Sequence, residues 1–132
     1  MATDLLHRAT TAAIIEAFYE VYNTLGFGFL ESVYGSALDR ELRARGREVA
    51  RECGVHVVYK GVPLSAHRLD FLVDGCVVVE LKAGAALPPI AEIQLRNYLR
   101  ATNLQVGLLL WFGPDPHFKR VVSFNRVNPV LP

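Results

Sequence analysis

Three charged residues, Asp70, Glu80 and Lys82, lie in one of the most apolar parts of this 132-residue chain. Glu80 and Lys82 stand two residues apart in "CVVVELKA" (76–83), and Asp70 precedes "FLV" (71–73). A charge in apolar surroundings is costly unless it is paired or coordinates a metal. Two carboxylates are hard oxygen ligands that suit Mg²⁺ or Mn²⁺. A lysine beside such a metal can help to activate water or stabilise developing negative charge.

A purely structural role is the alternative for the same residues. Glu80 with Lys82, or Asp70 with neighbouring Arg68, would form ion pairs without a metal. A Glu-x-Lys pair alone is common, so its spacing does not decide between the two interpretations. The position of Asp70 at hairpin distance, within apolar sequence, favours the metal site.

The hairpin that carries these residues predicts which side chains share a face. Side chains alternate between the two faces of a strand. One face therefore contains only apolar side chains: Leu69, Phe71 and Val73 on the first strand, and Val77, Val79, Leu81 and Ala83 on the second. Asp70, Glu80 and Lys82 lie on the opposite face, with Glu80 and Lys82 about 6–7 Å apart along the strand.

The length of the turn decides whether Asp70 and Glu80 meet. A two-residue turn at Asp74-Gly75 would pair Val73 with Cys76 and place Asp70 on the wrong face from Glu80. A three-residue loop or a bulge, with Gly75 at positive φ, restores the match. We therefore predict an odd-length loop.

The pattern of the chain predicts the elements that must position these residues. Helices are expected over about 5–25, capped by Asp4, over 30–45, ended by Gly46, and over 88–102, opened by Pro88 and Pro89. Strands are expected over 47–61, 64–73, 76–83, 105–113 and 119–127, with a turn at 114–117. The order α-α-β-β-β-α-β-β predicts an α/β fold, one mixed β-sheet flanked by helices.

Composition restricts the class of protein. The length fits one domain over residues 1–132, and the hydrophobic share of 52% is high enough to suggest a homodimer face. Cys53 and Cys76 have no metal-ligand spacing, so we expect buried, reduced thiols and a cytoplasmic protein. The sequence shows no signal peptide and no apolar stretch long enough to span a membrane.

The net charge of +1 gives no global sign of nucleic-acid binding, but arginines are concentrated in one segment. They are Arg40, Arg43, Arg45, Arg47 and Arg51. They either end a solvated helix, where they complement the helix dipole, or form a patch that contacts phosphates. The sequence leaves both interpretations open.

Two further motifs accompany the acidic pair. Gly28, Glu31 and Tyr34 form G-x-x-E-x-x-Y, and Gln94 and Tyr98 form Q-x-x-x-Y. Together with Asp70 and the Glu80-Leu81-Lys82 triplet, they resemble the GxxExxY proteins, a small branch of the PD-(D/E)XK nuclease superfamily. The resemblance covers about residues 10–123 and implies a restriction-endonuclease-like fold. It departs from the family at Phe27, often Pro there, and at Ala91, often His.

The resemblance implies a role for each matching residue. Asp70 and Glu80 would bind Mg²⁺ or Mn²⁺, and Lys82 would be the catalytic lysine. Glu31 would bring a third carboxylate to the metal, directly or through water. Gln94 and Tyr98 would border the site and orient the substrate. Considered without the motif, Glu31 is an exposed acid, and Tyr34 and Tyr98 are core aromatics with hydrogen-bonded hydroxyls.

The function that this set implies is metal-dependent hydrolysis of phosphodiester bonds, with DNA as the substrate by analogy with the family. The alternative is a non-enzymatic nucleic-acid- or protein-binding module on the same fold. A homodimer or a partner protein could help to hold the substrate. The histidines, which are His7, His56, His67 and His117, receive no catalytic role, although His67 lies nearest to Asp70.

Overall fold

The predicted order of elements is confirmed in the computed structural model, which describes residues 6–124. The helices are α2 (Arg8–Leu25), α3 (Glu31–Ala44) and α4 (Ile90–Ala101). The strands are β1 (Val49–Tyr59), β2 (Val62–Val73), β3 (Val77–Ala83), β4 (Val106–Phe112) and β5 (Pro116–Val122). The expected cap at Asp4 lies outside the described residues. Within the described part, no helix is long and apolar enough to cross a bilayer.

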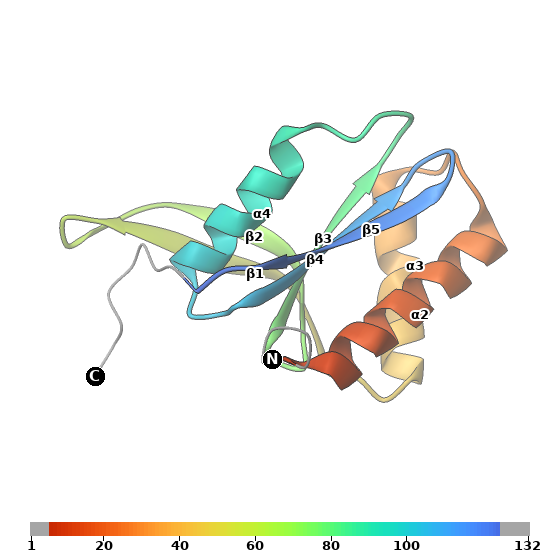
Figure 1. Cartoon of the computed structure of the whole chain (residues 1–132), viewed down its shortest axis with the longest axis horizontal. Helices are drawn as coiled ribbons and strands as arrows, with labels where there is room; N and C mark the ends of the chain where they lie inside the picture. The colour runs from red at the N-terminus through yellow and green to blue at the C-terminus, as the bar shows by residue number, and fades with distance from the viewer. Residues whose placement is uncertain (1–5, 125–132) are drawn as a thin grey trace.

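The strands of the described part form one mixed five-stranded sheet in the order β1-β2-β3-β4-β5. β3 and β4 run parallel, and the other neighbouring strands pair antiparallel. Helix α4 makes the crossover that a parallel pair requires. Helices α2 and α3 cover one face of the sheet and α4 covers the other (Figure 1). The predicted mixed sheet flanked by helices is confirmed.

The central strands are buried on both faces, which explains why β3 and β4 read as nearly continuous apolar runs. Beneath α2 and α3, the core contains the fully buried rings of Phe18, Tyr34, Phe71 and Phe112. On the opposite face, α4 packs on Val78 and its neighbours. Because side chains alternate along β3, Glu80, two residues after Val78, points to the α4 face.

The loop between β2 and β3 has the odd length that the charged residues require. Val73 pairs with Val77, which leaves three residues, 74–76, in the loop. Gly75 has a φ of 67°, as predicted, and Asp74 also has a positive φ, of 54°. The Cys76 N–H donates to the Val73 carbonyl at 3.1 Å. The prediction of a three-residue loop is confirmed.

The prediction that Leu69 shares a face with Phe71 and Val73 is wrong. Leu69 packs in the cluster beneath α4, whereas Phe71 and Val73 pack beneath α2 and α3. Opposite this point on β1, Glu52 has a φ of 53° and lies between two regular pairs of the ladder. A left-handed residue departs from the extended conformation on which the alternation of side chains depends, and the hairpin changes face at this point, next to Asp70.

The last strand begins earlier than predicted. β5 starts at Pro116 rather than at residue 119, and the turn before it covers residues 113–115 rather than 114–117. Pro116 is the first residue of an edge strand, a position where proline's missing N–H removes no ladder hydrogen bond. Residues 125–127 of the predicted strand lie outside the described residues.

The two cysteines are free, as predicted, but they are less buried than predicted. Cys53 and Cys76 are both half-buried, and they do not form a disulfide. Cys53 lies on β1, which is an edge of the sheet, and Cys76 lies in the loop before β3. Because neither position is a central strand, neither thiol is enclosed on all sides.

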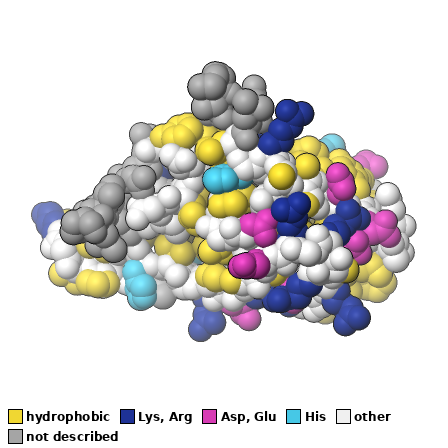
Figure 2. Space-filling view, turned by 90° about the horizontal axis from the view of Figure 1, so that it is seen from below, with side chains coloured by type: hydrophobic (Ala, Val, Ile, Leu, Met, Phe, Trp, Pro, Cys, Tyr) yellow, Lys and Arg dark blue, Asp and Glu magenta, His cyan; other side chains and the backbone are white. Residues whose placement is uncertain are grey.

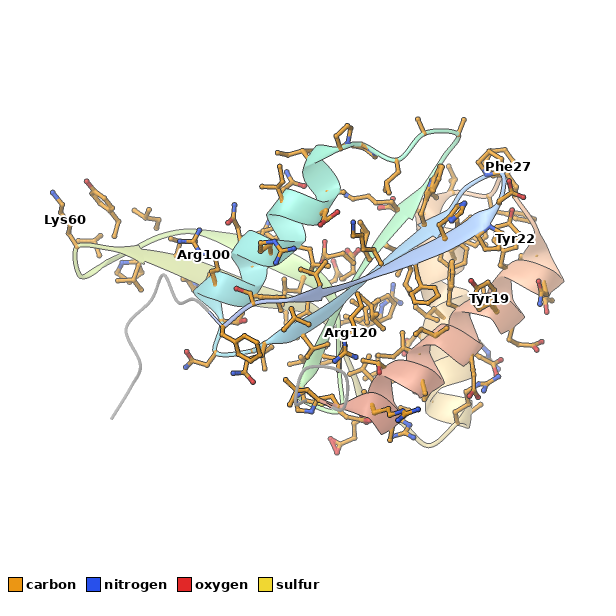
Figure 3. All side chains as sticks on the ribbon, viewed as in Figure 1. Tyr19, Tyr22, Phe27, Lys60, Arg100 and Arg120 are labelled. Carbon is orange, nitrogen blue, oxygen red and sulfur yellow. The ribbon has the colours of Figure 1, made fainter. Side chains whose placement is uncertain are left out.

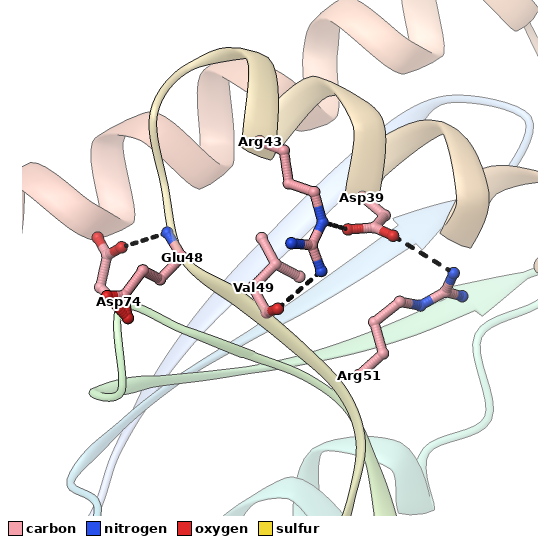
Figure 4. Close-up of polar contacts among 6 residues, drawn as sticks. All are labelled: Asp39, Arg43, Glu48, Val49, Arg51 and Asp74. Atoms are coloured by element: carbon pink, nitrogen blue, oxygen red, sulfur yellow. Dashed lines mark hydrogen bonds and ion pairs between the residues drawn. The ribbon is translucent and has the colours of Figure 1, made fainter.

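The arginine-rich segment forms ion pairs within the protein. Arg43 bonds Asp39 at 2.6 Å, and Arg51 lies 3.7 Å from the same carboxylate (Figure 4). Arg45 pairs with Glu41 at 2.9 Å and with Glu16 at 3.1 Å. Positive and negative side chains are intermixed on the surface shown in Figure 2. This pairing favours the structural interpretation of the segment over a phosphate-binding patch.

Asp74 links the β2–β3 loop to α2 and to the start of β1. Its Oδ2 accepts hydrogen bonds from Thr10 at 2.8 Å and Arg47 at 3.1 Å. Its Oδ1 accepts from the Glu48 N–H at 3.0 Å, which Figure 4 shows. Burial acts to raise the pKa of Asp74, but these hydrogen bonds and the charge of Arg47 outweigh it, so the pKa lies below its usual value. The ionised carboxylate therefore stabilises the folded state.

We expect Asp74→Asn to lower the free energy of unfolding by about 1–3 kcal/mol at neutral pH, because hydrogen bonds to a charged group are lost or weakened. The pKa of the folded state is depressed, so this stabilisation is present above the unfolded value of 3.8 and is lost as Asp74 is protonated at lower pH. Urea unfolding of both proteins across this range measures the difference. Asp115→Asn, in the exposed turn before β5, is the matched control. A difference in the free energy of unfolding between Asp74→Asn and the wild type that does not change with pH would contradict this account.

Candidate active site

β2 and β3 stop pairing next to the acidic residues. The ladder ends at the pair of Phe71 with Val79. Beyond it, the Asp70 N–H donates to Glu80 Oε2 at 2.9 Å, and the Leu81 N–H donates to Asp70 Oδ2 at 2.7 Å. Side-chain carboxylates therefore accept the hydrogen bonds that strand carbonyls would otherwise accept, and Asp70 and Glu80 face each other across the gap.

Glu31 brings a third carboxylate to the same end of β3. It is the first residue of α3, and its Oε1 accepts a hydrogen bond from the Ala83 N–H at 3.1 Å. Each of the three acids thus binds one backbone N–H of the β2–β3 pair. Glu31 and Asp70 also line one hollow of about 210 Å³ between α3 and the sheet.

The electrostatics of Glu80 show that its negative charge is poorly compensated. Glu80 is only 7% exposed. Burial and the charge of Asp70 raise its pKa to about 7; Glu31 adds to the shift, and the Asp70 N–H and Lys82 oppose it. Lys82 is half-buried on the same face of β3. Lys82 therefore offsets the charge of the buried Glu80 carboxylate only in part, and a poorly compensated carboxylate beside a second one is the electrostatic setting of a cation site.

The donor set fits a hard divalent cation. Mg²⁺ is usually held by one or two carboxylates and keeps several waters, and Asp70 with Glu80 provides such a pair. In the described part of the chain, no group of three or more His, Cys, Asp or Glu side chains is compact enough to hold a metal ion. Glu31 therefore does not join a direct three-ligand set in this arrangement, and a water would have to connect it to a cation.

Both residues of the Q-x-x-x-Y motif, Gln94 and Tyr98, lie on α4, but they differ in burial. The pKa of Tyr98 is raised by burial and by the charges of Glu80 and Asp70, so this half-buried side chain lies within electrostatic reach of the acids. Gln94 is one helical turn earlier on the same side of α4. It is exposed.

Tyr34 and Gly28 support the loop that leads to Glu31. Tyr34 is fully buried and stacks on Phe112, with ring centroids 4.2 Å apart. Its hydroxyl donates to the Gly26 carbonyl and accepts from the Phe29 N–H at 3.2 Å. Gly28 has a φ of 113°, which favours glycine. Tyr34 is thus a core aromatic, and the motif fixes the entry to α3.

Two residues at the site received no specific role from the sequence. Arg51 lines the hollow with Glu31 and Asp70 and lies over the Phe71 ring, 5.1 Å from its centroid. The sequence showed Arg51 only as one of several arginines in its segment. The pairing of Arg51 with Phe71 across β1 and β2, which the sequence does not reveal, is what brings this arginine to the site.

The other residue is His67, which is exposed and stacks on Tyr98. Its position three residues before Asp70 was the available sequence signal. The contact itself depends on how α4 packs over the hairpin, and the pattern of the sequence does not contain that information.

A comparison with protein-family models identifies the superfamily of the chain, and a comparison with solved structures finds a similar fold. A family model described as the PD-(D/E)XK nuclease superfamily matches residues 8–121. The crystal structure of SSO0001 has a similar fold, with a TM-score of 0.57 and 18% sequence identity. The match covers 92% of this chain and 60% of that chain, so this chain spans less than two thirds of the length of that structure. No curated protein matches the sequence.

We expect Glu80→Gln to be more stable than the wild type at about pH 8 in EDTA, by up to about 3 kcal/mol. The pKa in the folded state is raised from 4.5 to about 7, so the folded state binds the proton more tightly. The associated stability is complete below the unfolded value and is lost as the pH rises through about 7.

Urea unfolding of both proteins at about pH 4 and about pH 8 tests this difference. The two proteins should have similar stability at the lower pH, and Mg²⁺ should reduce the deficit of the wild type at the higher pH. Glu20→Gln, an exposed acid on α2, is the control. Equal stability of wild type and Glu80→Gln at both pH values would contradict the raised pKa.

Proposed function

This chain belongs to the PD-(D/E)XK nuclease superfamily, and from that premise we propose that it is a metal-dependent nuclease that hydrolyses phosphodiester bonds in DNA. The observation that carries the proposal is the Asp70–Glu80 pair at the open end of the β2–β3 ladder. A buried carboxylate beside a second one, with a lysine two residues away, is suited to bind a divalent cation. We further assign the chain to the GxxExxY branch, on the motif of Gly28, Glu31 and Tyr34.

In this proposal, Asp70 and Glu80 would hold Mg²⁺ or Mn²⁺. The metal would supply Lewis acidity at the phosphate and favour ionisation of water. The chain's own contribution is positioning. The Leu81 N–H and the Asp70 N–H each fix one carboxylate oxygen, and such fixed ligands keep their geometry when charge develops.

The remaining site residues would act on the substrate and on water. Lys82, as an ammonium, would stabilise negative charge on the phosphate in the transition state. Glu31, fixed by the Ala83 N–H, would orient water from the α3 side. Arg51 differs from the other paired arginines of its segment, because its contact with Asp39 is long, at 3.7 Å, and it lines the hollow that contains Asp70, so it would contact a phosphate there. Gln94 and Tyr98 would border the substrate from α4.

A bound metal would also change the charge balance of the protein. The sequence contains 14 Lys and Arg residues against 13 Asp and Glu residues. Neutralising Glu31, Asp70 and Glu80 leaves 14 positive against 13 − 3 = 10 negative side chains. The protein would then attract a polyanion more strongly than its net charge of +1 suggests.

A non-enzymatic nucleic-acid- or protein-binding module is the second candidate. One observation favours it, namely that the acids of the described part do not form a compact three-ligand group. We also propose that the protein acts in the cytoplasm, where thiols such as Cys53 and Cys76 stay reduced. A homodimer could cover exposed apolar side chains such as Leu30, which is 74% exposed.

Isothermal titration calorimetry with Mg²⁺ or Mn²⁺ tests the metal site. We expect binding at millimolar metal by the wild type and none by Asp70→Asn, which keeps an oxygen for the Leu81 N–H but removes the charge. Asp115→Asn, at an exposed turn, should bind like the wild type. Absence of binding by the wild type at millimolar metal would remove the nuclease proposal and leave the binding module.

Cleavage assays separate Lys82 from the metal ligands. We expect Lys82→Ala to retain metal binding but to lose about 10²- to 10³-fold in kcat, because it removes transition-state charge stabilisation. Linear, circular and single-stranded DNA and RNA are the substrates. Lys119→Ala, an exposed lysine on β5, is the control. A Lys82→Ala protein as active as the wild type would exclude the catalytic role.

A further inference from the structure

His67 and Tyr98 form a stacked pair of rings at the edge of the candidate active site. Their centroids lie 4.1 Å apart with an interplanar angle of 19°. The Tyr98 hydroxyl lies 3.4 Å from His67 Nδ1, a long contact at the limit of a hydrogen bond. Tyr98 comes from α4 and His67 from β2, three residues before Asp70. The stack thus joins the helix to the strand that carries a catalytic carboxylate.

The two rings differ in burial, which gives the stack an inner and an outer side. Tyr98 is half-buried and packs against the apolar cluster beneath α4, within electrostatic reach of Glu80 and Asp70. His67 is exposed. Since Tyr98 covers one face of the imidazole, the exposed surface of His67 lies on the side away from α4. The structure therefore presents an aromatic surface to solvent next to the acids.

The hairpin around His67 has a charge that suits a nucleic-acid backbone. Between Glu52 and Asp70 the sequence contains Lys60 and Arg68 and no acidic residue. Lys60 lies at the tip of the β1–β2 hairpin, far from the helices (Figure 3). Arg68 follows His67 directly on β2 and therefore lies on the opposite face, so a phosphate backbone that leaves the acids along the His67 face would approach Lys60 at the tip and meet no carboxylate of the hairpin.

We propose that the His67–Tyr98 stack is a base-binding subsite, in which the nucleobase next to the scissile phosphate stacks on the outer face of His67. This inference rests on the proposed function, because it places the neighbouring phosphate beside Asp70 and Glu80. Stacking on an aromatic ring tolerates any base, since every base has a π-face, and changes affinity by roughly 5- to 150-fold per base. Tyr98 holds the imidazole parallel to the incoming base.

The subsite defines the class of substrate. In a duplex, the faces of each base are covered by the neighbouring base pairs, so a protein ring can receive a base only where it is unstacked. The proposal therefore predicts that the protein acts on single strands, or on duplexes with unpaired nucleotides at the cleavage position. A fully paired duplex should bind more weakly than the matching single strand.

A coupling experiment between protein and ligand tests the subsite. Binding of a fluorescent single-stranded oligonucleotide of about 16 nucleotides is measured by anisotropy, with Ca²⁺ in place of Mg²⁺ to prevent cleavage. An abasic analogue replaces each nucleotide in turn. In the wild type, one abasic position should weaken binding by roughly 5- to 150-fold. His67→Ala should bind the intact oligonucleotide as weakly as the wild type binds the abasic analogue. An abasic nucleotide at that position should not weaken binding by His67→Ala any further.

Variants of the stack separate base contact from a structural role. His67→Phe keeps a ring for stacking and should retain both the affinity and the sensitivity to the abasic position. His56→Ala is the matched control, because His56 is an exposed histidine of the same hairpin whose Nδ1 bonds the Leu64 carbonyl. It should leave the position-specific loss unchanged.

The outcomes that overturn the inference are distinct from those that overturn the proposed function. A wild type that binds and cleaves, with the same abasic profile and affinity in His67→Ala, would refute the subsite and leave the nuclease. Tighter binding of a fully paired duplex than of the single strand would do the same. A wild type that neither binds nor cleaves any of these nucleic acids would refute the nuclease and the subsite together.

Discussion

The structure depends on an exchange of hydrogen bonds where β2 and β3 separate. Instead of continuing the ladder, Asp70 and Glu80 each accept a backbone N–H from the opposite side of the gap, at 2.7–2.9 Å. An unpaired N–H in the interior of a sheet is costly, so the carboxylates stabilise an opening that would otherwise close. Burial of Glu80, and then the charge of Asp70 across the same opening, raise the pKa of Glu80 to about 7. The same two carboxylates thus stabilise the separation of β2 and β3 and form the candidate metal site.

The segment from Gly26 to Tyr34 places a third acid, Glu31, at the end of β3. Gly28 supplies a backbone conformation with positive φ, and the buried Tyr34 hydroxyl fixes the loop before α3 through Gly26 and Phe29. α3 can then begin at Glu31, whose carboxylate reaches the end of β3. The glycine and the tyrosine of the motif therefore have structural roles, and the glutamate alone faces the site. A change in either structural residue would act on the site by displacing Glu31.

Most of the candidate site could be predicted from the alternation of side chains along the strands, because alternation depends only on local backbone geometry. The faces of Glu80 and Lys82, the three-residue loop and the order of the elements all follow from the period of a strand and from turn chemistry. The change of face at Leu69 did not follow, since it depends on a distortion at Glu52 on another strand. The stacking of His67 on Tyr98 was also beyond the sequence, because it depends on how a helix packs across the sheet. Contacts between residues far apart in the chain leave no periodic pattern in the sequence.

The central claim is that Asp70 and Glu80 together bind a divalent cation at the open end of the ladder. Crystals of the protein soaked in Mn²⁺ and measured at the manganese absorption edge test it most directly, because anomalous scattering locates the ion without assumptions about its ligands. We expect an anomalous peak about 2.1 Å from an oxygen of each carboxylate. Full occupancy at another position, or no peak near either residue at millimolar Mn²⁺, would contradict the account.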